Sequence, residues 1–143
     1  MNRDSQRSAV YSWENLNVAP HDRTVVPFAQ IEAIVRYVWE REGLEYPPQV
    51  LPLPRQKHKG GDATRTTVRF GKSTYTWIIL HELAHSMTST VDSRSNVHGA
   101  LFMGIYCKLL TRYLNIDLDM LMKTAEAANL QVQLEAIPVF LER

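Results

Sequence analysis

The sequence predicts a single α+β domain, in which a small, partly antiparallel sheet packs against a group of helices. Three observations predict this fold class. Several segments carry apolar residues at helical spacing, residues 64–70 alternate like a strand, and prolines limit residues 46–54 to the edge of a sheet. The chain has the length of one ordinary domain, so residues 1–143 are expected to share one core.

Two helices are predicted in the N-terminal part, where apolar residues recur at helical spacing. The first covers residues 3–14. A connector with Pro20 and Asp22 leads to the second helix, which begins near Phe28 and ends near Gly43. The apolar stripes consist of Ala9, Val10 and Trp13 in the first helix, and of Ile31, Ile34, Val35, Val38 and Trp39 in the second.

The strands are expected between residues 49 and 70. Four prolines make residues 46–54 an edge strand or an extended connection. Residues 55–61 are basic and end in glycine, which indicates a loop. Residues 64–70 are rich in threonine and valine, and this composition predicts a strand.

A strongly apolar helix follows and is expected at the centre of the fold. It covers residues 75 to about 87, with Ser73 or Thr74 as its N-cap. Polar residues 88–96 then indicate a loop. The apolar residues of the helix are Trp77, Ile78, Ile79, Leu80, Leu83 and Ala84.

The C-terminal part is predicted to contain two more helices. Residues 97–114 form the first of them. Asn115 or Asp117 caps the second, which runs to about Ala128. Residues 130–134 are a short strand or an extended tail.

The central helix contains the sequence His81-Glu82-Leu83-Ala84-His85, which is the HExxH pattern of zinc peptidases. Residues four apart lie one above the other on a helix, so both imidazoles can reach one zinc ion. Glu82 can act as the general base, because zinc lowers the pKa of a bound water to about 7. The pattern predicts a hydrolase with zinc as its cofactor.

A catalytic zinc needs a third protein ligand and leaves its fourth position to water. His98 is the best candidate, because it lies beyond a polar loop and near the start of the next helix. The alternatives are Asp92, Glu126 and Glu135. Cys107 is the only cysteine, which excludes a cysteine-rich zinc site and an intramolecular disulfide.

The motif and its surroundings resemble a known family. His81 to His85, followed by His98-Gly99-Ala100-Leu101-Phe102, is similar to the HExxH…HGxxF arrangement of SprT-like zinc metallopeptidases over residues 74–114. Together with Arg3-Asp4-Ser5-Gln6-Arg7 and the Val-Leu-Pro segment, the chain also resembles small HExxH metallohydrolases of actinobacteria and their phages.

The resemblance implies a zincin-like fold with His81, His85 and His98 as zinc ligands and Glu82 as the general base. It also implies that Gly99 permits close packing beside the metal. Phe102 would then anchor the following helix in the core. SprT-like proteins often carry a zinc ribbon with paired cysteines, and this chain has only one cysteine.

The leading hypothesis is a zinc metallopeptidase that cleaves a polypeptide substrate. The alternatives are a zinc amidohydrolase with a non-peptide substrate and a metal-stabilised module that binds DNA or protein. The strand at residues 64–70 is predicted to pair with an extended substrate. Candidates for stabilising the oxyanion are Tyr106, Tyr75 and Arg112.

The charge and hydropathy of the chain limit the classes of partner that it is expected to bind. The net charge of +1 argues against general nucleic-acid binding, although a basic stretch around Asp62 could form a positive lip beside the active site. That stretch consists of Arg55, Lys57, Lys59, Arg65, Arg69 and Lys72. The polar N-terminus and the lack of an apolar run of about 20 residues predict a cytoplasmic protein that does not contact a membrane. The oligomeric state is left open.

Overall fold

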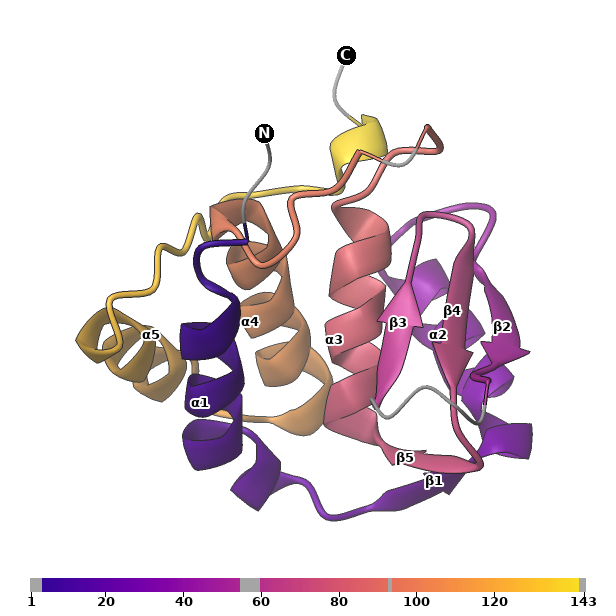
Figure 1. The fold of residues 1–143 in the computed structure, drawn as a ribbon, viewed down its shortest axis with the longest axis horizontal. Coiled ribbons are helices and arrows are strands. Elements are labelled where there is room, and N and C mark those ends of the chain that lie inside the picture. Colours follow the sequence, from indigo (N-terminus) through magenta and orange to yellow (C-terminus); the bar gives the residue numbers. More distant parts are fainter. Residues whose placement is uncertain (1–3, 55–59, 93, 142–143) are drawn as a thin grey trace.

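The computed structural model describes residues 4–54, 60–92 and 94–141, and these residues form the α+β arrangement that was predicted (Figure 1). Three helices lie on one side of the central helix, and the strands lie on the other side together with the helix of residues 28–41. The described elements are α1 (Arg7–Asn17), η1 (Ala19–His21), β1 (Val25–Pro27), α2 (Phe28–Arg41), β2 (Gln49–Pro52), β3 (Gly61–Ala63), β4 (Thr67–Phe70), β5 (Ser73–Tyr75), α3 (Thr76–Met87), α4 (Ala100–Leu114), α5 (Leu118–Ala127) and η2 (Val139–Leu141).

The larger sheet has three strands in the order β2-β4-β3. β2 runs parallel to β4 and β3 runs antiparallel to it, so the sheet is mixed. β2 lies at an edge, as its prolines predicted. A proline has no main-chain N–H to donate, so it is tolerated where a strand has a neighbour on one side only.

The strand predicted at residues 64–70 is shorter and lies elsewhere in the sheet than expected. The main-chain nitrogen of Thr64 donates to the carbonyl oxygen of Thr67 at 2.8 Å, and this turn delays the start of β4 to Thr67. β4 is also the central strand, so it cannot pair with a substrate as predicted. The second edge strand is β3, which packs against α3 and whose sequence Gly61-Asp62-Ala63 has little strand propensity and was not predicted.

A separate ribbon of β1 and β5 was also missed. Ser73 and Thr74 lie in β5 and pair with β1, so the predicted N-cap at these residues is wrong. Tyr75 is the N-cap residue of α3, and its side chain makes no capping bond. Instead Asp22, from the connector after α1, accepts a hydrogen bond from the main-chain nitrogen of Trp77 at 2.9 Å. A residue distant in sequence therefore caps the central helix.

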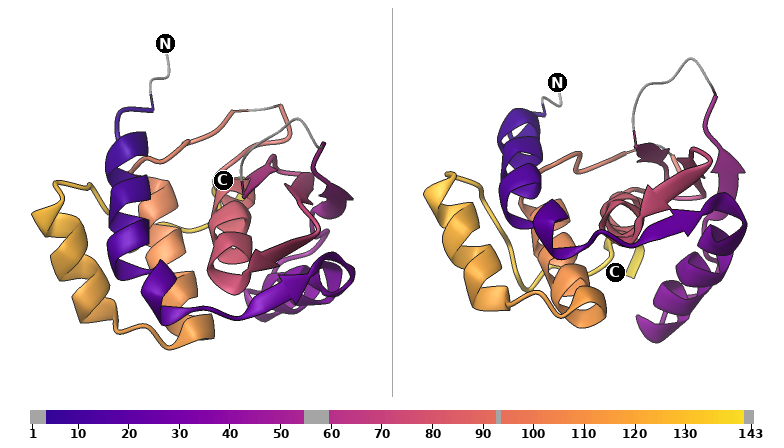
Figure 2. Two further views of the ribbon diagram at one scale, coloured as in Figure 1. Left: turned by 60° about the horizontal axis from the view of Figure 1, so that its bottom comes forward. Right: turned by 90° about the horizontal axis from the view of Figure 1, so that it is seen from below.

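α3 occupies the centre of the molecule, as its apolar sequence predicted (Figure 1). It packs against α4 on one side and against β3 and β4 on the other. Because both faces are covered, most of the helix is buried, including His81 and Glu82. Two views of the ribbon show α1 beside α4 and α5, on the opposite side of α3 from the sheet (Figure 2).

The other helices were predicted, with differences at their starts and at the end of α1, which is Asn17 rather than Glu14. α1 begins at Arg7 rather than at residue 3. α4 begins at Ala100 rather than at Val97, because Val97 has a left-handed backbone (φ 51°) that cannot belong to a helix. Asp117 caps α5 by accepting from the main-chain nitrogen of Met120 at 3.2 Å, whereas Asn115 ends α4 in a left-handed conformation.

Residues 130–134 are not a strand, and the alternative of an extended tail is confirmed. The tail crosses α4, where the nitrogen of Gln133 donates to the carbonyl oxygen of Ala100 at 3.0 Å. A Cβ on Gly104 would lie 1.7 Å from the carbonyl oxygen of Gln133, so the tail passes where only glycine fits. Within the described residues, no helix is both long and apolar enough to cross a membrane.

Candidate functional site

α3 brings three residues of the HExxH pattern to one place. His81 and Glu82 are buried, with 6% and 5% of their surface exposed, and His85 is partly buried one turn later. The Nε2 atoms of His81 and His85 lie 3.2 Å apart. The helix therefore presents two imidazole nitrogens side by side, as the spacing predicted.

His98 completes the cluster from outside the helix. It precedes α4, and its Nε2 atom lies 3.2 Å from that of His85 and 3.4 Å from that of His81. Zinc bound tetrahedrally at about 2.0–2.1 Å would separate its nitrogen ligands by about 3.3 Å. The three nitrogens thus have the spacing of ligands that share one ion, and the cluster can hold a metal.

Phe102 lies under the cluster. Its ring is fully buried and stacks on the His85 ring at 4.4 Å between centroids. It also contacts the rings of His81 and His98, at 5.0 and 5.1 Å. An apolar ring behind the imidazoles keeps water from that side and leaves the nitrogens directed to the other.

Gly99 allows a close approach, but to a side chain and not to the cluster. A Cβ at this position would lie 2.7 Å from Oδ1 of Asn96. That oxygen accepts a hydrogen bond from the main-chain nitrogen of Phe102 at 3.0 Å and so caps the first turn of α4. The glycine therefore fixes the start of α4 next to His98.

Two carboxylates hold the outer nitrogens of the histidines, and neither is among the residues predicted from sequence. Nδ1 of His81 bonds Oε2 of Glu14 at 2.5 Å, and Nδ1 of His98 bonds Oδ2 of Asp4 at 2.6 Å. With Nδ1 bound in this way, Nε2 is the nitrogen left to face a metal. Carboxylate–histidine pairs of this kind are typical of metal sites.

Comparison with known proteins finds no matching family model, no significantly similar curated protein and no significantly similar solved structure. The interpretation of the site depends on its geometry.

Glu14 could have been found in the sequence. It follows Trp13 on the face of α1 that also carries Val10, so a carboxylate stands on an otherwise apolar stripe. Buried carboxylates are rare unless they have a partner. Asp4 gives no such signal, since it precedes the helix and only the fold brings it to His98.

The surroundings set the charge of each imidazole. Burial opposes protonation of His81, but the hydrogen bond and charge of Glu14, together with the charges of Glu82 and Asp4, raise its pKa. Burial, and then repulsion from His81 and His98, holds the pKa of His85 well below its usual value. Burial also lowers the pKa of His98, although the bond to Asp4 opposes this. A neutral imidazole is the form that binds a metal.

Two adjoining cavities open onto the cluster, with volumes of about 450 Å³ and 240 Å³. Both are lined by Arg7, Tyr11, Gly61, His81 and Glu82. We call the two cavities together the groove. Its walls are α1 and β3, and α3 forms its floor. His81 and Glu82 line both cavities, whereas His85 and His98 line the smaller one.

β3 approaches the floor of the groove closely at Gly61. A Cβ there would lie 2.9 Å from the carbonyl oxygen of Arg69 and 3.1 Å from Cγ of Glu82. Glycine therefore lets the strand pass directly beside the carboxylate predicted to be the base.

The alternative third ligands lie outside the cluster. Asp92 is exposed in the loop before α4, where it contacts Thr90 and Arg94. Glu126 and Glu135 are exposed on α5 and on the tail. Among the described residues, only the three histidines form a group that can hold a metal.

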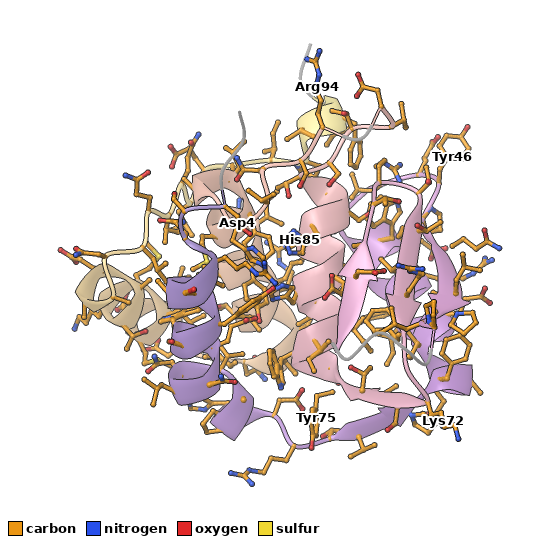
Figure 3. All side chains as sticks on the ribbon, viewed as in Figure 1. Asp4, Tyr46, Lys72, Tyr75, His85 and Arg94 are labelled. Carbon is orange, nitrogen blue, oxygen red and sulfur yellow. The ribbon has the colours of Figure 1, made fainter. Side chains whose placement is uncertain are left out.

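The predicted oxyanion candidates do not line the groove. Tyr106 is fully buried, and its hydroxyl donates to Oε2 of Glu14 at 2.6 Å. Arg112 donates to Glu42 at 2.6 Å, at the far end of α4. Tyr75 lies at the lower edge of the molecule, away from His85 and Asp4 (Figure 3).

The predicted basic lip is not assembled in the described residues. Arg69 pairs with Asp62 at 2.5 Å, and Arg65 is buried between the rings of Trp39 and Phe140. Lys72 is exposed, but it lies at the lower edge of the molecule, as Tyr75 does, away from His85 and Asp4 (Figure 3). Residues 55, 57 and 59 lie outside the described ranges.

Proposed function

We propose that this protein is a zinc-dependent hydrolase, and that its substrates are polypeptides, which would make it a metallopeptidase. The observation that carries the proposal is the meeting of three histidine Nε2 atoms, within 3.4 Å of one another, with Glu82 at the floor of the groove. Three nitrogen ligands and a carboxylate in an open groove are the parts that hydrolysis by a zinc enzyme requires.

Each residue has a defined task. His81, His85 and His98 would hold the metal, which would acidify a water molecule and polarise a carbonyl group. Glu82 takes the proton from the attacking water and passes it to the leaving amine. Glu14 and Asp4 keep the histidines in place through their Nδ1 atoms.

An open site favours catalysis over a structural metal. A structural zinc normally has four protein ligands, whereas three cluster among the described residues. All three histidines line the smaller cavity of the groove, so a substrate could reach a metal held there. A structural site would also have no use for Glu82 beside the ligands.

The edge of β3 favours a peptide substrate. Among the described residues, β3 pairs with β4 alone, and its residues 61–63 line the groove beside His85 and Glu82. Main-chain groups at a sheet edge can bind an extended polypeptide without reading its side chains. This role, expected for residues 64–70, is transferred to β3.

The decisive test compares Glu82→Gln with Glu126→Gln, since Glu126 is an exposed glutamate outside the site. Cleavage of unfolded casein and zinc content are measured on the same samples. We expect Glu82→Gln to retain zinc and to lose about 10²- to 10⁴-fold in cleavage rate, the usual contribution of a positioned base. Glu126→Gln should match the wild type.

Two outcomes would contradict the proposal. Unchanged cleavage by Glu82→Gln with zinc retained would remove Glu82 as the base. A wild-type protein that binds one zinc but cleaves no polypeptide would exclude the peptidase, and a screen of small amides would then test the alternative of an amidohydrolase.

A further inference from the structure

We propose that Tyr11 donates a hydrogen bond to the substrate carbonyl oxygen as that oxygen becomes negative, and that Arg7 holds the Tyr11 ring in place. The inference rests on the proposed function, because it adds an electrophilic group to the same site. It assigns a catalytic role to α1, which the sequence did not connect with the chemistry.

The position of Tyr11 in the groove carries the argument. Five residues line both cavities, and they surround the point where a substrate would meet the metal. His81 and Glu82 come from α3, and Gly61 has no side chain. Nδ1 of His81 is bonded to Glu14 and its Nε2 belongs to the histidine cluster. The side-chain donors left for a substrate are therefore those of Tyr11 and Arg7, which come from the wall opposite β3.

The Tyr11 ring lies against two of the three histidines. Its centroid is 5.1 Å from that of His98, edge to face, and 6.3 Å from that of His81. The residue is nevertheless 40% exposed, and it lines both cavities of the groove. A phenol in this position lies next to the metal and is accessible to a substrate.

Arg7 stabilises this arrangement from the same helix. Its guanidinium lies 5.7 Å from the centroid of the Tyr11 ring, four residues and one turn away. A cation over the face of a tyrosine ring is attracted to it and limits its rotation. The guanidinium also brings positive charge to the groove, which favours the developing oxyanion.

Such a donor is needed opposite the base. Glu82 attracts the proton of the attacking water, while the carbonyl oxygen of the substrate gains negative charge on the other side. The previously expected donors cannot serve, since the hydroxyl of Tyr106 is buried on Glu14 and Arg112 is bound to Glu42. Tyr11 is the tyrosine that both cavities share.

The test uses Tyr11→Phe and, as a matched control, Tyr75→Phe. The two tyrosines are equally exposed, at 40% and 39%, but Tyr75 lies away from the cluster. The proteins are loaded with Co²⁺, and acetohydroxamate, which binds the metal through its oxygens, is titrated by visible absorption. Loss of one hydrogen bond to the probe should weaken its binding about 10-fold in Tyr11→Phe and leave Tyr75→Phe unchanged.

The second measurement is casein cleavage by the zinc form. We expect kcat of Tyr11→Phe to fall about 10²- to 10³-fold, as on removal of an oxyanion donor, with little change in KM. Arg7→Met should show a smaller loss, and metal content should stay at the wild-type value in all three variants.

The two proposals can fail separately. If Glu82→Gln is inactive but Tyr11→Phe cleaves casein and binds acetohydroxamate like the wild type, the role of Tyr11 is refuted and the hydrolase stands. If the wild type cleaves nothing, weaker acetohydroxamate binding by Tyr11→Phe still supports the phenol at the metal. Loss of metal from Tyr11→Phe would overturn the proposal, because it would make Tyr11 part of the metal-holding set.

Discussion

At Glu14, a single carboxylate oxygen serves two donors. Oε2 accepts from the Tyr106 hydroxyl at 2.6 Å and bonds Nδ1 of His81 at 2.5 Å. All three side chains are buried, and burial together with the charge of Glu14 raises the pKa of Tyr106 well above its usual value, so Tyr106 stays a donor. The orientation of His81 therefore depends on a residue 67 positions away in sequence.

This dependence predicts the effect of Glu14→Gln. The amide keeps the size of the side chain but loses its charge, so it holds the His81 ring less firmly. We expect metal affinity to fall about 10- to 100-fold, the usual effect of removing a group that orients a ligand. Competition with a chromogenic chelator measures the affinity.

Glu42→Gln is the matched control. Glu42 also accepts from a tyrosine hydroxyl, that of Tyr113 at 2.6 Å, but it lies at the end of α2 away from the histidines. It should lower the stability and leave the metal affinity unchanged. Equal metal affinity in the two variants would show that Glu14 does not position His81.

Cys107 offers another test at the level of a single residue. The thiol is fully buried in α4, and burial raises its pKa to about 12. Since the thiolate is the reactive form, Cys107 should not react with Ellman's reagent at pH 8 in the native protein and should react fully in guanidinium. Rapid labelling of the native protein would contradict this packing of α4.

Among the elements, α1 has more tasks than its sequence indicated. α1 carries Glu14, which bonds His81, and Asp4, which bonds His98, lies just before the helix. This segment therefore positions two of the three histidines through their Nδ1 atoms. The same helix supplies Arg7 and Tyr11 to the groove. α1 can do both because it lies between α5 and the groove. The face with Glu14 is buried, and the face with Arg7 and Tyr11 lines the cavities.

The C-terminal tail and α4 also depend on each other for their positions. Gln6 links them to the site, because its amide nitrogen donates to the carbonyl oxygen of His98 at 2.8 Å and its oxygen accepts from the nitrogen of Gln131 at 2.6 Å. The tail also passes over Gly104. Movement of the tail would therefore displace the backbone of His98.

Gly104→Ala should separate the tail from α4. The added methyl group would overlap the carbonyl oxygen of Gln133, so we expect a loss of about 1–3 kcal/mol in urea unfolding, despite the higher helix propensity of alanine. Gly71→Ala is the control, because a Cβ there has no neighbour within 4 Å. A destabilisation of the same size in both variants would reject the contact as the cause.

For the whole molecule, the metal would connect α3 with the segment before α4, in addition to their packing and hydrogen bonds. His81 and His85 belong to α3, while His98 belongs to the segment before α4 and is bonded to Asp4. These groups meet only in the folded chain, so metal binding adds to the free energy of unfolding.

Removal of the metal should therefore lower the Tm. At a free metal concentration of 100 times Kd, the bound metal adds about 2.7 kcal/mol, which corresponds to several degrees in a chain of this size. Differential scanning fluorimetry with EDTA and with added zinc measures the shift. His98→Ala should lose the shift and Asp92→Ala should keep it, and the reverse result would make Asp92 the third ligand.

The predictions from sequence were most accurate where local patterns dominate. The apolar stripes gave α2 and α3 nearly to the residue, and of the two residues predicted to cap α5, Asp117 and Asn115, the first is its cap. The short strands β1, β3 and β5 were missed, since three residues such as Gly61-Asp62-Ala63 form a strand only when a neighbouring strand is present.

The sequence by itself determined the α+β class, the central apolar helix and the pairing of His81 with His85, because these depend on the periodicity of one segment. Only the tertiary structure decided that His98, and not Asp92, joins the two histidines, and that Asp4 and Glu14 hold His98 and His81. It also decided that β3 is the edge strand beside the groove. These features join residues far apart in the chain. Their distances are fixed by the packing of helices and strands, which no local pattern encodes.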